Sequence, residues 1–196
     1  MEEKVFNFAI IGCGVIAPNH AEGIVNTPNA RLVAVADIVE EKARSFAQKY
    51  NCDWYLDYKE MLDRPDIDIV NICTPSGLHP EMAIEAMKRG KHVITEKPMA
   101  ITLEQADAMI SASKEYNRKL ACIFQRRTQS VFKKIKEVIS QGAIGRLILG
   151  DAYMKYFRSQ AYYDSGDWRG TWALDGGGAL MNQGIHCIDL MQWIMG

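Results

Sequence analysis

Short apolar runs alternate along the first two thirds of the chain with longer segments in which apolar residues recur every three or four positions. The short runs are typical of buried β-strands, and the longer segments are typical of amphipathic helices. Strands are predicted at residues 5–11, 31–37, 52–55, 67–73, 91–95 and 120–124, and helices at residues 40–50, 58–62, 81–89 and 103–117. With a further helix after the first strand, this alternation predicts an α/β fold with a doubly wound, six-stranded parallel sheet over residues 1–124.

The remaining residues, 125–196, follow a less regular pattern. We expect a helix at residues 130–140, an apolar strand at 147–156, a long loop, and a helical stretch that ends at residues 193–196. This pattern predicts a second, incomplete α/β domain. A single strand leaves an apolar face uncovered, so we expect this fragment to be poorly stable alone or to associate through that face.

The first predicted strand ends in a turn that contains Gly12 and Gly14. Gly12 permits a tight turn and Gly14 allows the main chain to approach a pyrophosphate, because neither residue has a Cβ atom. Ala17 is the small third residue of the G-x-G-x-x-G/A pattern, in which the N-terminus of a helix receives the phosphates. The turn therefore predicts a dinucleotide site.

Asp37 ends the second predicted strand, about 20 residues past the glycines, where a carboxylate accepts hydrogen bonds from the ribose hydroxyls and repels a 2′-phosphate. The alternative is that Asp37 caps the helix at residues 40–50. No arginine directly follows it. We therefore expect NAD in preference to NADP.

Two further loops follow predicted strands, Thr74-Pro75-Ser76-Gly77-Leu78-His79 and Glu96-Lys97-Pro98. In an open parallel sheet the loops at the carboxyl ends of the strands gather over one crevice, which is where ligands bind. The sequence thus places both loops beside the glycine turn.

The composition adds mainly exclusions. With 196 residues, 48% hydrophobic residues and a formal net charge of −1, the chain can bury a core and shows no bias toward nucleic acid or membrane surfaces. The charged N-terminus gives no sign of a signal peptide, and no apolar run is long enough to span a bilayer, so a cytoplasmic location is expected. The five cysteines lack C-x-x-C spacing, which argues against a disulfide framework and a metal site.

These motifs resemble one known family. The glycine turn through His20, the Thr74–His79 loop, Glu96-Lys97-Pro98, and Gly176-Gly177-Gly178 followed by His186 and Asp189 are similar, in order, to the glucose-fructose oxidoreductases, inositol dehydrogenases and their relatives. The resemblance covers nearly the whole chain. It implies a Rossmann domain at residues 1–124 and, at 125–196, the first part of a substrate-binding and oligomerisation domain that is truncated here, because family members continue for many more residues.

The resemblance also implies the site residues and partners. The cofactor-binding residues would be Gly12, Gly14, Val15, Ile16, Asp37, Thr74, Pro75, His79, Glu96, Lys97, Trp168 and Arg169. The substrate-binding residues would be Lys97, Arg169, Asn182 and His186. A small sugar or nucleotide-sugar substrate and a homo-oligomer formed through the second-domain sheet are the expected partners.

Lys97 and His186 are the predicted catalytic residues. In the family the lysine corresponding to Lys97 contacts the reacting hydroxyl, and a cis bond to Pro98 would hold it inward. Without the resemblance, Lys97 would be interpreted as a surface lysine paired with Glu96. His186 could accept a proton or orient the hydroxyl, and the alternative is a core histidine on an amphipathic helix.

If a helix begins at the three glycines, Asn182, His186 and Asp189 share one face. Asp189 either orients His186 or bonds to the main chain. Inositol-dehydrogenase-like members have an aspartate where this chain has Asn182, and an amide cannot serve as the base. The proton then falls to Lys97 or His186, with Asn182 bonding to the sugar or the nicotinamide carboxamide.

The loop between the two motifs is rich in aromatic residues, namely Tyr162, Tyr163, Trp168 and Trp172. Aromatic faces suit a sugar ring or uracil, and Arg169 offers a bidentate fork for a carboxylate or diphosphate. Alternatively, the tryptophans anchor the loop. Arg126 and Arg127 are either a further anion contact or surface charge.

Three functional hypotheses follow. The motif at residues 176–186, with residues 168–172, resembles the branch that oxidises UDP-N-acetylglucosaminuronic acid at C3, so an NAD-dependent dehydrogenase of a UDP-linked N-acetylhexuronate is the first. A dehydrogenase of inositol or a free sugar is the second. A redox-silent dinucleotide-binding regulator is the third, and the presence of both Lys97 and His186 weighs against it.

Overall fold

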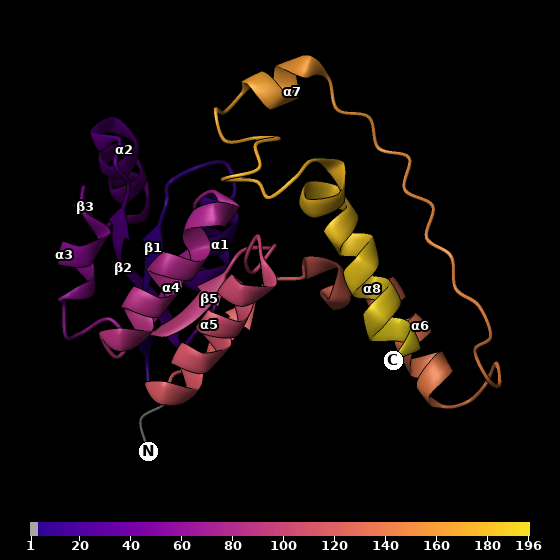
Figure 1. Cartoon of the computed structure of the whole chain (residues 1–196). Coiled ribbons are helices and arrows are strands. Elements are labelled where there is room, and N and C mark those ends of the chain that lie inside the picture. The colour runs from indigo at the N-terminus through magenta and orange to yellow at the C-terminus, as the bar shows by residue number, and fades with distance from the viewer. Residues whose placement is uncertain (1–3) are drawn as a thin grey trace. The chain divides into compact units, whose positions relative to one another are not determined.

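The structure is a computed structural model that describes residues 4–196. It contains two compact units, Met1–Cys122 and Ile123–Gly196 (Figure 1). Residues 1–3, on which part of the signal-peptide argument rests, lie outside the described residues.

The first unit is built on one parallel sheet. Its strands are β1 (Phe6–Ile11), β2 (Ala30–Ala36), β3 (Asp53–Tyr55), β4 (Ile69–Ile72), β5 (His92–Thr95) and β6 (Leu120–Cys122). They lie in the order β3-β2-β1-β4-β5-β6, and every pair is parallel. The strand order reverses between β1 and β4, which is the switch point at which such sheets bind ligands. The predicted α/β fold class is confirmed.

Helices cover both faces of this sheet. They are α1 (Ala17–Val25), α2 (Glu40–Tyr50), α3 (Tyr58–Leu62), α4 (His79–Lys88) and α5 (Leu103–Glu115), with a short 3₁₀ helix, η1 (Ser76–Leu78). The predicted bounds of α2 and α3 are confirmed. Helix α4 starts two residues earlier than predicted, because Pro80 fits the first turn of a helix.

Alternate residues of β1 belong to two separate cores. Ala9 and Ile11 pack with residues of α3, α4 and α5, whereas Ile10 packs with residues of α1 and α2. All three are at most 3% exposed. A strand that is buried on both faces carries successive apolar residues, which explains the unbroken apolar run at residues 8–11 in place of alternation.

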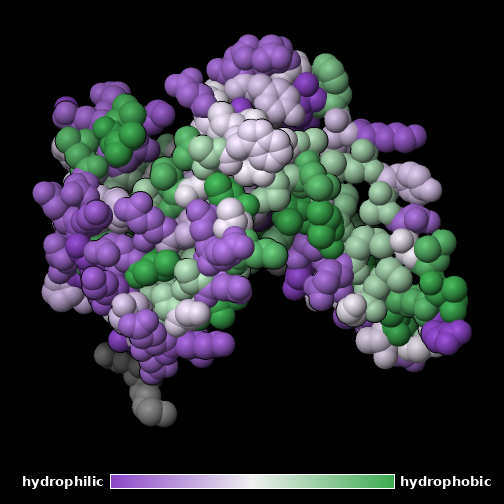
Figure 2. Space-filling model, in the orientation of Figure 1, coloured by the Kyte–Doolittle hydropathy of each residue, from purple (hydrophilic) through white to green (hydrophobic). Residues whose placement is uncertain are grey.

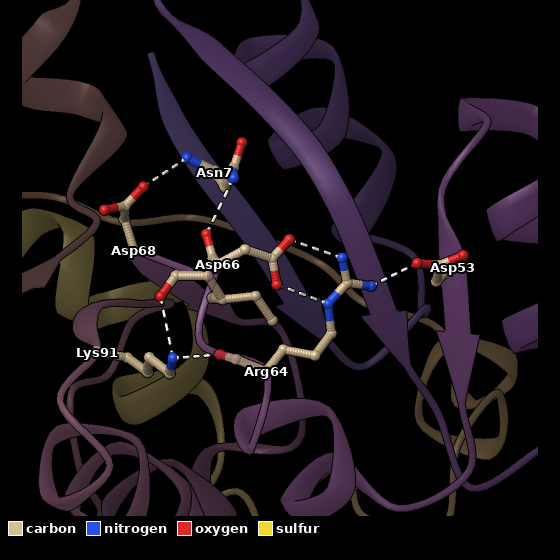
Figure 3. Close-up of polar contacts among 7 residues, drawn as sticks. Asn7, Asp53, Arg64, Asp66, Asp68 and Lys91 are labelled. Carbon is tan, nitrogen blue, oxygen red and sulfur yellow. Dashed lines mark hydrogen bonds and ion pairs between the residues drawn. The ribbon is translucent and has the colours of Figure 1, made fainter. Parts of the chain in front are cut away.

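A polar network braces the amino ends of the strands (Figure 3). Arg64 binds both carboxylate oxygens of Asp66, at 3.0 and 2.8 Å, and also reaches Asp53 at the start of β3. Asp68 accepts the main-chain N–H of Asn7 at 2.9 Å. Lys91, which is 5% exposed, donates to the carbonyl oxygens of residues 64 and 67 and fixes the loop that leads into β4. Burial lowers the pKa of Lys91.

The second unit is helical. It contains η2 (Gln125–Thr128), α6 (Ser130–Ser140), α7 (Gln160–Asp164), the π-helical turn η3 (Leu180–Gly184) and α8 (Ile185–Met195). Helices α6 and α8 contact each other. The predicted helix at 130–140 is confirmed. The predicted strand at 147–156 is wrong, since these residues have no regular structure and no described segment of this unit offers them a strand to pair with.

Apolar side chains reach the surface of the second unit. Helix α6 has no buried residue, and its apolar side forms a shallow groove with Ile144. Ile148 and Leu149 are also exposed. Green, hydrophobic residues are visible among purple, hydrophilic ones at the molecular surface (Figure 2). Within residues 4–196, no helix is both long and apolar enough to cross a bilayer.

The Lys91 contacts predict a stability effect. Lys91→Met keeps the apolar stem of the side chain but leaves two carbonyl groups without their donor, so we expect the free energy of unfolding to fall by about 1–3 kcal/mol. Lys88→Met, at an exposed position on α4, should change it by less than about 0.5 kcal/mol. Urea denaturation monitored by circular dichroism measures both values, and equal values for the two variants would contradict a structural role for Lys91.

Candidate cofactor and substrate site

The glycine turn follows β1 directly. Gly12 has a φ of +92°, and a Cβ atom there would lie 2.9 Å from the carbonyl oxygen of Cys73 at the end of β4. Both facts require glycine, because other residues rarely adopt this conformation and the carbonyl belongs to the main chain. The close approach of the two strand ends therefore depends on the missing side chain at position 12.

The surroundings of Gly14 are different from those of Gly12. A Cβ atom at Gly14 would have no atom of the described chain within 4 Å. The neighbouring Val15 is 87% exposed, and Ile16, at the N-cap of α1, gives no side-chain cap to the helix. The turn thus presents open main chain and the positive end of the α1 dipole, an arrangement that suits a phosphate group.

Asp37 lies beside this turn. Its Oδ2 accepts the main-chain N–H of Cys13 at 2.8 Å, and its Oδ1 accepts that of Val39 at 2.9 Å. The N-cap position of α2 is Val39, so Asp37 forms a local turn ahead of the helix and does not occupy the cap position. Burial, followed by the Asp37 charge, raises the pKa of the Cys13 thiol to about 12, so this cysteine is not a thiolate.

His79 joins the second and third loops. Its Nδ1 is 2.9 Å from the carbonyl oxygen of Pro98, and its Nε2 is 2.9 Å from that of Thr74. The residue is 1% exposed, and burial lowers its pKa although both carbonyls favour the charged ring. That Thr74, Pro75 and His79 bind the dinucleotide stays a prediction. In the structure the two hydrogen bonds of the His79 ring hold the second and third loops together.

The third loop carries Lys97. The bond from Lys97 to Pro98 is cis. Glu96 is 7% exposed, and its Oε1 lies 3.0 Å from Nε2 of His20 while its Oε2 accepts the main-chain N–H of Lys97 at 3.1 Å. Burial raises the pKa of Glu96, but the His20 and Lys97 contacts outweigh it and hold this pKa below its usual value. The carboxylate is therefore ionised and positioned by two donors.

A second polar cluster lies wholly within the second unit. Asp175 is 1% exposed, accepts the main-chain N–H of Gly170 at 2.8 Å, and receives the amide of Asn182 at 3.2 Å. The Asn182 oxygen accepts from Tyr162 at 3.2 Å and from Gln183 at 2.8 Å. Asn182 is thus bound by neighbouring side chains of its own unit.

Arg169 extends this cluster. Its Nη1 donates to the Tyr162 hydroxyl at 2.9 Å, and its guanidinium lies over the rings of Tyr162 and Trp168, 4.5 and 4.8 Å from their centroids. Its Nε is buried, and no described residue accepts a hydrogen bond from it. Trp172, by contrast, is 83% exposed and does not anchor the loop.

The helix after the glycines differs from the prediction. Residues 180–184 form a π-helical turn, so Asn182 precedes the regular helix α8 that carries His186 and Asp189. All three are nevertheless at most 9% exposed. The Asp189 carboxylate is bound by Arg127 through two nitrogens, which makes it an ion-pair partner instead of a main-chain contact. Arg126 bonds to the Tyr156 hydroxyl.

The structure therefore groups the predicted residues in two sets. Gly12, Asp37, Thr74, His79, Glu96 and Lys97 belong to the first unit, and Trp168, Arg169, Asn182 and His186 belong to the second. Asp175, His20 and Asn71 have no role that is predicted from the sequence. The local sequence signal for Asp175 is an aspartate directly before a glycine run.

The first unit fits a dinucleotide. Gly12 and Gly14 leave main chain open at the start of α1, and the Asp37 carboxylate stands beside the turn where it can meet ribose hydroxyls. These features define an NAD-binding Rossmann domain.

Comparison with known proteins agrees with this class. Residues 6–124 match the model described as "Oxidoreductase family, NAD-binding Rossmann fold", and residues 132–196 match the GFO/IDH/MocA C-terminal domain. The chain belongs to this oxidoreductase family, as its motifs predicted.

Individual relatives are similar to nearly all of the chain. The WlbA dehydrogenase of Bordetella pertussis, solved with NADH and UDP-GlcNAcA, has a TM-score of 0.92 and 35% identity over 100% of this chain and 57% of its own. Myo-inositol 2-dehydrogenase of Thermotoga maritima is 31% identical over 95% of this chain and 54% of its own length. D-glucoside 3-dehydrogenase of Escherichia coli K12 is 31% identical over 100% of this chain and 56% of its own length. The chain spans little more than half the length of these relatives.

The two glycines predict separable effects. Gly14→Ala should fold normally but weaken NADH binding by about 10- to 100-fold, since the new methyl group enters the space over the turn. Gly12→Ala should lose about 1–3 kcal/mol of stability through backbone strain. NADH fluorescence titration and thermal unfolding separate the two effects. Gly23→Ala, on helix α1 that follows the turn and with open space around it, is the control, and normal NADH binding by Gly14→Ala would contradict the assignment.

Proposed function

We propose that the protein is an NAD-dependent oxidoreductase that transfers hydride between a nicotinamide cofactor and a secondary hydroxyl of a sugar. The observation that carries this proposal is the position of Lys97 at the carboxyl end of β5, on the same edge of the sheet as the glycine turn. The similarity to inositol and glucoside dehydrogenases supports it.

The residues of the chain have separate roles in this reaction. NAD, when bound, accepts the hydride. Lys97 Nζ takes the proton of the reacting hydroxyl as the carbonyl forms, and returns it in the reverse direction. His186 is the second proposed catalytic residue and orients the hydroxyl or shares its proton. Glu96 holds the main chain at Lys97, and the Asp37 carboxylate selects NAD over NADP.

The proposed substrate is a UDP-linked N-acetylhexuronate, oxidised at C3. Arg169 supports this choice, because Tyr162 and Trp168 orient its guanidinium, whose planar fork suits a carboxylate or diphosphate. The structural likeness to a dehydrogenase solved with UDP-GlcNAcA points in the same direction.

A dehydrogenase of inositol or a free sugar is the second candidate, which the similarity to myo-inositol 2-dehydrogenase favours. Asn182 weighs against it, since an amide that is held by Asp175 cannot act as a base. A redox-silent regulator would need neither Lys97 nor His186. The cytoplasmic location and the homo-oligomer expected from the sequence stay predictions.

The catalytic assignment predicts a loss of turnover without a loss of cofactor. Lys97→Met should lower kcat by about 10²- to 10⁴-fold, the usual effect of removing an acid–base group. NADH affinity should stay close to that of the unchanged protein. Reduction of NAD is followed by absorbance with UDP-N-acetylglucosaminuronate, UDP-N-acetylglucosamine and myo-inositol, with a keto acceptor added in parallel to recycle any tightly held NADH.

Turnover of the uronate alone would support the full proposal. Turnover of inositol alone would select the second candidate, and NADH binding with no turnover of any sugar would favour the regulator.

The substrate assignment predicts an effect at Arg169. Arg169→Ala should raise KM for the uronate by about 10- to 100-fold, corresponding to one lost charge-assisted hydrogen bond pair. Arg169→Lys should recover little, because an ammonium lacks the planar fork. Arg146→Ala, at an exposed position, serves as the control. An unchanged KM in Arg169→Ala would remove this residue from substrate recognition.

A further inference from the structure

His20 connects the glycine-turn helix to the loop that carries Lys97. It lies on the first turn of α1, with its Nε2 3.0 Å from Glu96 Oε1 and its Nδ1 2.9 Å from Asn71 Nδ2. The side chains of His20 and Glu96 are 8% and 9% exposed, and Asn71 is 4% exposed. Three buried polar groups from α1, β4 and the end of β5 therefore meet in the interior of the first unit.

The chemistry of these groups sets the direction of each hydrogen bond. The Glu96 carboxylate is ionised and can only accept, so Nε2 of His20 carries a proton and donates it. Nδ1 then accepts from the Asn71 amide. The second carboxylate oxygen of Glu96 accepts the main-chain N–H of Lys97. One chain of donors thus runs from Asn71 through His20 to Glu96, where it meets the main chain of Lys97.

We propose that His20 is a positioning residue that fixes Lys97 through Glu96. The inference rests on the proposed function for the role of Lys97 in proton transfer. A carboxylate held by His20 on one oxygen cannot rotate away from the Lys97 N–H, so the direction in which the lysine leaves the main chain is fixed. Because α1 also begins at the glycine turn, the same contact ties the segment that receives the pyrophosphate to the loop that carries the lysine.

His20 does not conduct protons in this arrangement. Its Nδ1 is occupied by Asn71, whose Oδ1 is buried and has no partner among the described residues. The chain of groups therefore ends in the core and does not lead to solvent. Its contribution is to the orientation of the loop.

Two substitutions separate the hydrogen bond of His20 to Glu96 from its hydrogen bond to Asn71. In His20→Gln the side-chain amide nitrogen stands near the former Nε2 and can still donate to Glu96. In His20→Asn the amide stands near the former Nδ1 and retains the Asn71 contact, but nothing reaches Glu96. Glu22→Gln, on the solvent-exposed part of the same helix, is the control.

The first readout needs no turnover. Exchange of the Lys97 amide proton, followed by NMR on protein with ¹⁵N-labelled lysine, should be at least about tenfold faster in His20→Asn than in the unchanged protein. It should be restored in His20→Gln. Thermal unfolding confirms that each variant is folded. The peak is assigned by its disappearance in Lys97→Arg.

The second readout is kinetic. His20→Asn should lower kcat by about 10- to 100-fold, the cost of a displaced catalytic group, while the Kd for NADH stays within about threefold. His20→Gln should recover most of kcat. Unchanged amide exchange in His20→Asn, or a His20→Gln variant as impaired as His20→Asn, would overturn the proposal. If no form of the protein oxidises any sugar but amide exchange responds as expected, the proposed function fails and the link from His20 to Lys97 stands.

Discussion

The site depends on the register of the parallel hydrogen-bond ladder. Ile11 pairs with Ala36 on one side and with Ile72 on the other, and Ile72 pairs with Thr95. Four strands therefore end in a single row. The residues that follow this row are Gly12, Asp37, Cys73 and Glu96. A shift of β1 by one residue would exchange the side chains that it gives to the two cores and move its loop along the edge, so the cores and the cofactor site are fixed by the same ladder.

Much of the first unit could be predicted because its signals are local. Apolar runs such as residues 67–73 and the periodic segment at 40–50 each define their own element, and their alternation predicts a doubly wound parallel sheet. The glycine turn could likewise be predicted from its local sequence pattern. Gly12 lies against Cys73, as a tight turn between strand ends requires, and Gly14 leaves the main chain open.

The remaining features were missed because they depend on contacts between distant residues. His20 and Glu96 are separated by 76 positions, and no spacing rule connects them. Asp175 acquires its importance only when Asn182 and the main chain of Gly170 fold around it. The apolar segment 147–156 has strand-like composition, but a strand exists only when a neighbour satisfies its N–H and C=O groups, and the second unit offers none.

The polar cluster of the second unit gives Asn182, in the motif at residues 176–186, structural contacts of its own. The expected contact of Asn182 with the sugar or the nicotinamide carboxamide stays a prediction. Within its own unit the Asn182 amide connects the buried Asp175 carboxylate to the Tyr162 hydroxyl. That tyrosine in turn receives Arg169. An arginine held in this way loses less conformational entropy when an anion binds than a freely rotating one does. The asparagine at position 182 thus affects how Arg169 is held, through Tyr162, as well as which group can act as the base.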